Sequence, residues 1–172
     1  MKKVVLIGYM GSGKSTVAQK LAFQLGKVPL DLDEVIEKKM GMTIETIFNT
    51  KGEIYFRRLE HELFLEVLQD ANDVIISTGG GTPCYYNNHE LLNSDHVVSV
   101  YLNASVDNLF QRLIEEKQKR PLLANLENTE IKEFIAKHLF DRSFYYNQAT
   151  FKVLVDGKSV DDIVAEIENL LA

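Results

Sequence analysis

Residues 8–15 read GYMGSGKS, and no other segment constrains the chain as strongly. The segment fits the pattern G-x-x-x-x-G-K-[ST], in which glycines let backbone N–H groups converge on a chain of phosphates. A following helix would add the positive end of its dipole, Lys14 a cation for the β- and γ-phosphates, and Ser15 a hydroxyl ligand for Mg²⁺. A random chain of this length would match the pattern roughly once in 200. The motif therefore predicts a binding site for a nucleoside triphosphate.

The surrounding sequence supplies the strand and the helix that such a loop needs. Residues 4–7 form an apolar run typical of a buried strand, and Val17, Leu21 and Leu25 follow at helical spacing before Gly26. Further strands are predicted at 28–32, 74–77, 97–102 and 151–155, and further helices at 33–40, 43–48, 52–69, 129–139 and after the capping residues Ser105 and Ser159. This alternation predicts an α/β fold with a parallel sheet between helices, and ligands at the carboxyl ends of its strands.

The composition predicts a single globular domain over residues 1–172 and narrows the possible partners. Hydrophobic residues make up 45% and charged residues 26%, which excludes general disorder, and no apolar run approaches the ~20 residues of a membrane-spanning helix. The net charge of −6 disfavours a nucleic-acid partner, although local arginines could hold a small anion. Cys84 is the single cysteine, so no internal disulfide can form. We expect a cytoplasmic protein without a membrane partner or a targeting segment.

Asp31 and Asp33 bring two carboxylates to the end of a predicted strand. If the strand persists, both side chains lie on one of its faces. One carboxylate could then serve the water shell of a metal ion while the other accepts a substrate hydroxyl. The alternative is an exposed strand end followed by a helix that Asp33 caps, and the spacing alone leaves both interpretations open.

A second candidate pair lies on the long helix predicted at 52–69. Arg57 could grip a carboxylate with its two-pronged guanidinium, and Glu60, three residues later, could steady it from the same helix face. Taken alone, however, a solvated ion pair on an amphipathic helix is the more common explanation of this spacing.

Three consecutive glycines, Gly79-Gly80-Gly81, come just after the strand predicted at 74–77. Because three glycines cost conformational entropy, they favour the close approach of another group over a plain loop. No aspartate ends this strand, although many phosphate-loop proteins hold their metal with one there. Asp31 is the available substitute.

Two further arginines are candidates for anion binding. Arg120 follows the charged run 115–119 and could close over a phosphoryl group in transfer, neutralising charge in the transition state. Arg142 could be a second anchor for an anion. An exposed basic loop explains Arg120 equally well, and a surface ion pair is the more common explanation of an isolated arginine such as Arg142.

The order of these motifs resembles the shikimate kinases over essentially the whole chain. The resemblance rests on the glycine loop at 8–15, Asp31-x-Asp33, Phe56-Arg57-x-x-Glu60, Gly79-Gly80-Gly81, Arg120-Pro121-Leu122-Leu123 and Arg142-x-x-x-Tyr146. It implies a P-loop NTPase fold like that of nucleoside monophosphate kinases, a three-layer α/β/α arrangement around a five-stranded parallel sheet. The implied reaction is transfer of the γ-phosphoryl group of ATP to the 3-hydroxyl of shikimate, a step toward chorismate and the aromatic amino acids.

The same resemblance implies roles for individual residues and segments. ATP would be held by Gly11, Ser12, Gly13, Lys14, Ser15, Thr16 and Arg120. Shikimate would be held by Asp33, Arg57, Gly80 and Arg142, and Mg²⁺ by Ser15 and Asp31. Lys14, Asp33 and Arg120 would act in catalysis. A substrate-binding segment is implied at 33–61 and a lid at 113–125, and we expect a monomer.

Three alternatives predict different features. Another small-molecule P-loop kinase, such as a gluconate or nucleotide kinase, would have an acceptor pocket without two carboxylate-seeking arginines. A regulatory GTPase would need an Asn-Lys-x-Asp motif, which the sequence lacks. A catalytically inactive shikimate-binding module is disfavoured by the presence of Lys14, Ser15, Asp33 and Arg120.

Overall fold

A parallel sheet forms the centre of the computed structural model, which describes residues 2–120 and 123–172. Its strands are β1 (Lys3–Ile7), β2 (Val28–Asp31), β3 (Val74–Ser77), β4 (Val97–Asn103) and β5 (Phe151–Leu154). They lie in the order β2-β3-β1-β4-β5, and neighbouring strands run parallel. All five residues of the central strand β1 are buried, as expected for a strand covered on both faces. The prediction of a five-stranded parallel sheet is confirmed.

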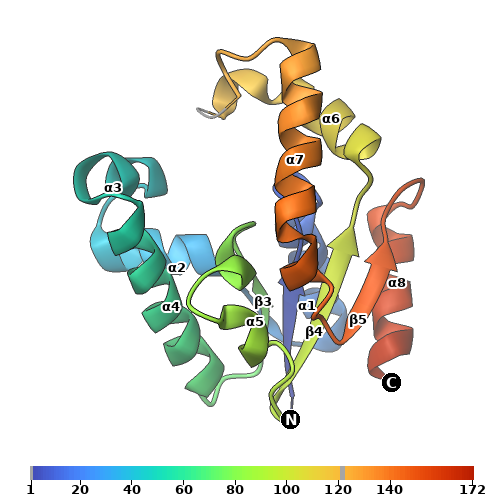
Figure 1. Cartoon of the computed structure of the whole chain (residues 1–172). Helices are drawn as coiled ribbons and strands as arrows, with labels where there is room; N and C mark the ends of the chain where they lie inside the picture. The colour runs from blue at the N-terminus through green and yellow to red at the C-terminus, as the bar shows by residue number, and fades with distance from the viewer. Residues whose placement is uncertain (1, 121–122) are drawn as a thin grey trace.

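Helices cover both faces of this sheet and complete the three layers (Figure 1). They are α1 (Lys14–Leu25), α2 (Leu32–Met40), α3 (Ile44–Lys51), α4 (Glu53–Gln69), α5 (Asn88–Leu91), α6 (Val106–Glu115), α7 (Asn128–Tyr146) and α8 (Val160–Leu171), with short 3₁₀ turns η1 (Thr82–Cys84) and η2 (Lys117–Lys119). Helices α1 and α8 pack together on one face, and α4, α5 and α7 lie on the other. The three-layer α/β/α prediction is confirmed.

Several predicted helix ends are found where the sequence puts them. Gly26 ends α1 with a left-handed backbone (φ 65°), and its N–H donates to carbonyl oxygens of the last turn. Ser105 and Ser159 cap α6 and α8, each accepting a hydrogen bond from a backbone N–H of the first turn. The two serines lie on the connections that leave the carboxyl ends of β4 and β5, whereas Gly26 lies on the connection that enters β2.

The strand predicted at 28–32 is one residue shorter, which corrects the expected arrangement of Asp31 and Asp33. The Asp31 Oδ1 atom accepts hydrogen bonds from the backbone N–H groups of Asp33 and Glu34 at 2.9 and 3.4 Å. These bonds start α2 at Leu32, so Asp33 lies on a helix rather than on a strand face. The helix cap is Asp31, and the alternative that Asp33 caps α2 is wrong.

Two other helices are longer than predicted. The helix expected at 43–48 continues to Lys51 before Gly52 ends it. The helix expected at 129–139 begins in a capping box of Glu127 and Glu130 and continues to Tyr146. Arg142 therefore lies within α7, near its carboxyl end, and not on a connection that follows the helix.

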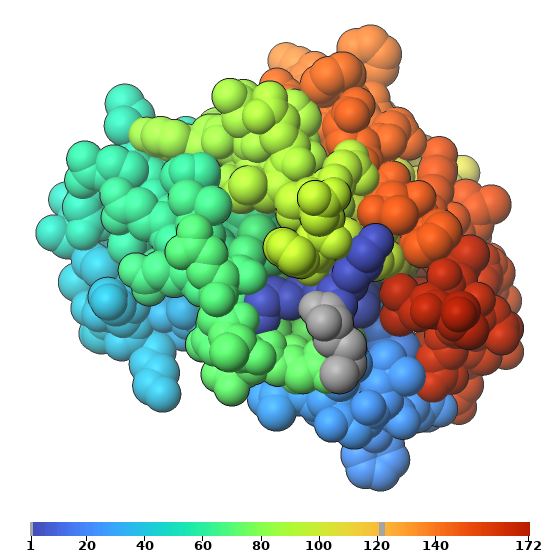
Figure 2. All heavy atoms as spheres, turned by 90° about the horizontal axis from the view of Figure 1, so that it is seen from below, coloured from blue at the N-terminus to red at the C-terminus, as the bar shows by residue number. Residues whose placement is uncertain are grey.

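The two ends of the sheet differ. The phosphate loop, Asp31 and the triple glycine all lie at the carboxyl ends of the strands, as predicted. Figure 2 shows the opposite end, where the start of β1 lies in a hollow of about 590 Å³ between the α4–β3 connection and the residues before β4. Within the described part of the chain, no helix is both long enough and apolar enough to cross a bilayer.

Candidate active site

The phosphate loop adopts a shape that its glycines make possible. Gly13 has a left-handed backbone with φ 96°, and a Cβ on Gly8 would lie 2.8 Å from the Leu102 carbonyl oxygen. The buried Lys14 Nζ donates to the carbonyl oxygens of Gly8 and Tyr9 at 2.7 and 3.0 Å. Burial lowers the pKa of Lys14 to about 8, opposed by the charge of Asp33, so the amine remains protonated at neutral pH. The loop thus encloses a positive charge.

A serine and an aspartate meet at the mouth of this loop. Ser15 Oγ donates to Asp31 Oδ2 at 2.8 Å, and Ser77 Oγ donates to the same oxygen at 3.1 Å. Ser77 ends β3, so these two hydrogen bonds bring the end of that strand and the phosphate loop to one carboxylate. These hard oxygen donors fit Mg²⁺, which binds through one or two protein oxygens together with phosphate and water.

Asp33 faces Lys14 from the first turn of α2. Burial raises the pKa of Asp33 to about 6, assisted by the negative charges of Asp31 and Glu60 and opposed by Lys14. The carboxylate is therefore still mostly ionised at neutral pH, but it holds a proton more readily than an exposed aspartate. Such a group can accept a hydrogen bond, and then a proton, from a substrate hydroxyl.

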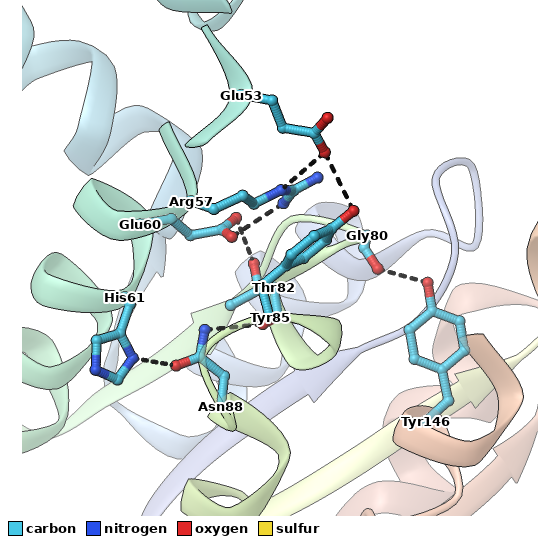
Figure 3. A network of polar contacts seen from close by, with 9 residues as sticks. All are labelled: Glu53, Arg57, Glu60, His61, Gly80, Thr82, Tyr85, Asn88 and Tyr146. Carbon is cyan, nitrogen blue, oxygen red and sulfur yellow. Dashed lines mark hydrogen bonds and ion pairs between the residues drawn. The ribbon is translucent and has the colours of Figure 1, made fainter. Parts of the chain in front are cut away.

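Arg57 is held by carboxylates on two sides (Figure 3). Its Nη1 atom lies 3.0 Å from Glu60 Oε1, and its Nε atom lies 3.7 Å from Glu53 Oε1. Glu60 is completely buried, and its other oxygen accepts a hydrogen bond from Thr82 Oγ1 at 2.9 Å. A solvated ion pair is therefore the wrong interpretation of Arg57 and Glu60. That description fits the neighbouring Arg58, which is 60% exposed.

An aromatic ring completes the setting of Arg57. The guanidinium carbon lies 4.1 Å from the ring centroid of Tyr85, close enough for a cation–π contact. The Tyr85 hydroxyl donates to Glu53 Oε1 at 3.1 Å, so Tyr85 is tied to the carboxylate that also pairs with Arg57 (Figure 3). No sequence motif marks Tyr85, because a pair of tyrosines more often serves packing.

The triple glycine lets three charged side chains come close to the backbone. A Cβ on Gly81 would lie 2.6 Å from both terminal nitrogens of Arg57, and one on Gly80 would lie 3.1 Å from Arg142 Nη1. A Cβ on Gly79 would lie 3.2 Å from Asp33 Oδ1. None of the three glycines has a positive φ, so these contacts, and not the turn, explain the glycines. The predicted close approach to this loop is confirmed.

Arg142 lies between the triple glycine and the phosphate loop. Its guanidinium carbon lies 5.7 Å from the ring centroid of Tyr9, next to Gly80. Tyr146, one turn later on α7, donates its hydroxyl to the Gly80 carbonyl oxygen at 2.6 Å (Figure 3). Helix α7 is thus attached to the glycine loop at the point where Arg142 reaches it. The alternative of a surface ion pair does not describe this setting, because Arg142 is partly buried and its neighbours are Tyr9 and Gly80.

A cavity of about 520 Å³ brings most of the predicted site residues together. It is lined, among others, by Gly11, Gly13, Lys14, Ser15, Thr16, Asp31, Asp33, Gly80 and Arg120. Arg57 and Arg142 lie directly behind this lining, beside Gly81 and Gly80. Ser12 does not line the cavity, because it is buried beneath the loop, and its hydroxyl has no hydrogen-bond partner among the described residues.

The charged segment after α6 forms one wall of the cavity. Arg120 pairs with Glu116, which accepts from its Nη2 and Nε atoms at 2.8 and 3.2 Å, and both residues line the cavity. Pro121 and Leu122, part of the predicted lid and motif, lie outside the described residues. Arg112 also lines the cavity and donates to the Gly11 carbonyl oxygen at 3.1 Å. Sequence reasoning missed Arg112, because no motif marks an arginine in mid-helix.

The fold and the cavity indicate a class of protein: P-loop enzymes that transfer a phosphoryl group between a nucleotide and a small acceptor. The family model of shikimate kinase matches residues 10–172. The chain belongs to the shikimate kinase family. The sequence-based prediction of a shikimate kinase, an ATP-dependent phosphotransferase with an alcohol acceptor, is confirmed.

Similar proteins extend over the full chain. A curated shikimate kinase of Flavobacterium johnsoniae is 58% identical over 100% of both chains. The crystal structure of shikimate kinase from Bacteroides thetaiotaomicron superimposes with a TM-score of 0.90 at 38% identity, covering 99% of this chain and 98% of that one. Shikimate kinase from Acinetobacter baumannii in complex with shikimate gives a TM-score of 0.88 at 32% identity, covering 99% and 93%. These structures confirm the fold prediction.

Proposed function

We propose that this chain performs the transfer from ATP to the 3-hydroxyl of shikimate with the phosphate loop on one side of Gly80 and a three-residue acceptor site on the other. One observation carries this proposal: Asp33, Arg57 and Arg142 all approach the triple glycine, although they are far apart in the sequence. A Cβ on Gly80 would also lie 3.3 Å from Met10 N, so the acceptor side adjoins the phosphate loop.

ATP would bind against the phosphate loop and the charged segment that follows α6. Backbone N–H groups of residues 11–16 would hold the phosphates of ATP, with the buried charge of Lys14 at the centre of the loop. Ser15 and Asp31 would hold Mg²⁺, which when bound neutralises phosphate charge. Arg120 would leave Glu116 and turn toward the phosphates, adding positive charge where the transition state needs it.

The acceptor side recognises a small carboxylate that carries hydroxyl groups. Arg57 and Arg142 supply two guanidinium groups for the carboxylate, and charge-assisted bonds of this kind are both strong and directional. Asp33 would hold the hydroxyl groups, and Gly80 would let the ring of shikimate lie against the backbone. Gluconate also carries a carboxylate and a nucleotide carries phosphate, so the two arginines alone do not separate these acceptors from shikimate. The match of the shikimate kinase family model over residues 10–172 is what disfavours this alternative.

The reaction itself depends on positioning and charge. Phosphoryl transfer proceeds through a loose transition state, so a strong general base is less important than holding the hydroxyl in line with the γ-phosphate. Asp33 is suited to orient the 3-hydroxyl, because it lies between Lys14 and the triple glycine. Its raised pKa also allows it to take the proton as the new P–O bond forms.

Residues 1–172 would form a single domain in which two segments have separate roles. We assign residues 33–61 to shikimate binding, because they carry Asp33 and Arg57, and 113–125 to a lid, because Arg120 stands on it. The chain would act as a monomer, since one copy supplies every residue assigned to both substrates. We assign it to the cytoplasm, where ATP is available and the thiol of Cys84 stays reduced.

The direct experiment measures ADP formation from ATP and Mg²⁺ with a panel of acceptors: shikimate, gluconate and a nucleoside monophosphate. The proposal predicts ADP release that depends on shikimate and stays at background with the other two. Equal turnover of gluconate or of the nucleotide would contradict the assignment of the acceptor side.

A further inference from the structure

Tyr9 is a residue of the phosphate loop that also contacts the acceptor side. Its side chain is 1% exposed, and its hydroxyl lies 3.0 Å from His138 Nδ1 on α7. Its carbonyl oxygen accepts hydrogen bonds from Lys14 Nζ at 3.0 Å and from Ser12 N at 3.1 Å. The main chain of Tyr9 thus belongs to the phosphate site, while its side chain reaches a different helix.

His138 and Arg142 are one helical turn apart on α7 and face the same neighbour. Residues four apart lie on one side of a helix, and both side chains contact Tyr9. The Tyr9 and His138 rings meet edge to face at 5.5 Å, and the Arg142 guanidinium carbon lies 5.7 Å from the Tyr9 ring centroid. The Tyr146 hydroxyl attaches this end of α7 to Gly80, and the Tyr9 side chain adds a second attachment, one that contacts the Arg142 guanidinium itself.

The protonation states suit a permanent hydrogen bond. Burial raises the pKa of the Tyr9 hydroxyl to about 12, so it stays neutral and can donate. Burial and the charge of Arg142 lower the pKa of His138, which leaves an unprotonated ring nitrogen as the acceptor. Phe134, on the same helix, also contacts the His138 ring, with the ring centroids 4.9 Å apart.

We propose that Tyr9 and His138 are a pair of positioning residues that align Arg142 with the shikimate carboxylate and connect the acceptor arginine to the phosphate loop. The proposal rests on the assignment of Arg142 to that carboxylate under the proposed function. A structural role alone would affect both substrates equally. If the pair aligns Arg142, its loss should weaken shikimate binding only while Arg142 is present.

The test uses Tyr9→Phe and His138→Leu, which each remove the hydrogen bond while keeping most of the packing. Each should raise the KM for shikimate roughly 2- to 10-fold, the range that a single hydrogen bond supports, and leave the KM for ATP within about twofold. His138→Asn offers a polar atom near the position of Nδ1 and should restore most of the affinity. The KM of the double variant Tyr9→Phe/His138→Leu for shikimate should be no higher than that of the more impaired single variant, because both substitutions remove the same hydrogen bond.

The matched control is Tyr101→Phe. Tyr101 is also buried and also donates its hydroxyl to a side chain, Asn103 Oδ1 at 3.1 Å, and its ring packs against Tyr146 at 5.1 Å, a contact that phenylalanine keeps. This variant should keep both KM values close to those of the parent. A comparable rise in the shikimate KM would mean that the loss of any buried hydroxyl has this effect, and would overturn the proposal.

The Arg142→Ala background separates the proposal from the assignment on which it rests. Shikimate binding is measured there by titration calorimetry, with and without Tyr9→Phe. We expect Arg142→Ala to weaken binding and Tyr9→Phe to add nothing further. If Arg142→Ala itself leaves binding unchanged, the proposed function fails at this residue. If it weakens binding but Tyr9→Phe has the same cost in both backgrounds, or no cost in either, the positioning role is overturned.

Discussion

The phosphate loop draws its groups from residues 8–16, whereas the acceptor side of the cavity collects side chains from separate segments between Asp33 and Arg142. The loop acts mainly through backbone groups whose directions are set by glycine conformations. The acceptor side acts through side chains that need neighbours to hold them, such as Glu60 behind Arg57 and Tyr9 beside Arg142. The first kind of site is local in sequence, and the second exists only after the chain has folded.

The two arginines of the acceptor side also differ from each other. Arg57 is paired with Glu60 and Glu53 and covered by the ring of Tyr85. Arg142 is bordered instead by Tyr9 and the Gly80 backbone. The positive charge of Arg57 is partly compensated before a substrate arrives, so we expect it to act more through orientation, and Arg142 more through charge.

The largest effect should follow from the loss of Lys14. Lys14→Ala removes the buried charge that the proposed function assigns to the phosphates, and we expect turnover to fall roughly 100- to 1000-fold or more. The fold should survive, because Lys14 is not part of the hydrophobic core, so the thermal unfolding midpoint should stay close to that of the parent. Activity assays together with calorimetry would check both points. Turnover like that of the parent protein would contradict the assignment of Lys14 to the phosphates.

A comparison of adjacent arginines tests the acceptor side. Arg57→Ala should weaken shikimate binding about 10- to 150-fold, since charge-assisted hydrogen bonds are worth roughly 1.5–3 kcal/mol, and leave ATP binding nearly unchanged. Arg58→Ala is the matched control, because Arg58 is exposed and contacts Glu62 and the ring of Tyr55, which carry no assigned role. Binding titrations on both variants would test this prediction. Equal losses of shikimate affinity would show that Arg57 contributes only general positive charge.

Gly81→Ala should have a smaller effect through Arg57. The backbone of Gly81 has φ −92°, which alanine adopts without strain, but the added Cβ would lie 2.6 Å from the terminal nitrogens of Arg57. The guanidinium must shift, so we expect the KM for shikimate to rise roughly tenfold with little change for ATP. In the Arg57→Ala background the same substitution should cost nothing further. A loss of the same size in both backgrounds would point to the loop rather than to the arginine.

The smallest effect concerns the lid. Residues 113–120 carry Glu116 and Arg120, whose ion pair must open before Arg120 reaches a phosphate. Hydrogen exchange in this segment should slow when an ATP analogue and shikimate are added together, while exchange in β1 stays slow throughout. Equal exchange with and without ligands would remove the basis for a lid.

The features that could be predicted from the sequence are those set by neighbouring residues. The phosphate loop, the cap at Gly26 and the alternation of strands and helices depend on local backbone preferences and on periodic burial. The early end of β2 was missed because the Asp31 side chain competes for backbone N–H groups, and the apolar pattern does not record that competition. The roles of Tyr9, Tyr85 and Arg112 were missed because their partners come from distant segments.

The central claim is that Arg57 and Arg142 hold the carboxylate of shikimate, and a cycle that changes both the protein and the substrate tests it most directly. Binding of shikimate and of its uncharged amide is measured by titration to the parent protein and to the Arg57→Ala/Arg142→Ala variant. The amide should bind the parent roughly 10- to 150-fold more weakly than shikimate, and the difference should nearly vanish on the variant. If the amide loses the same affinity on both proteins, the two arginines are not the partners of that carboxylate.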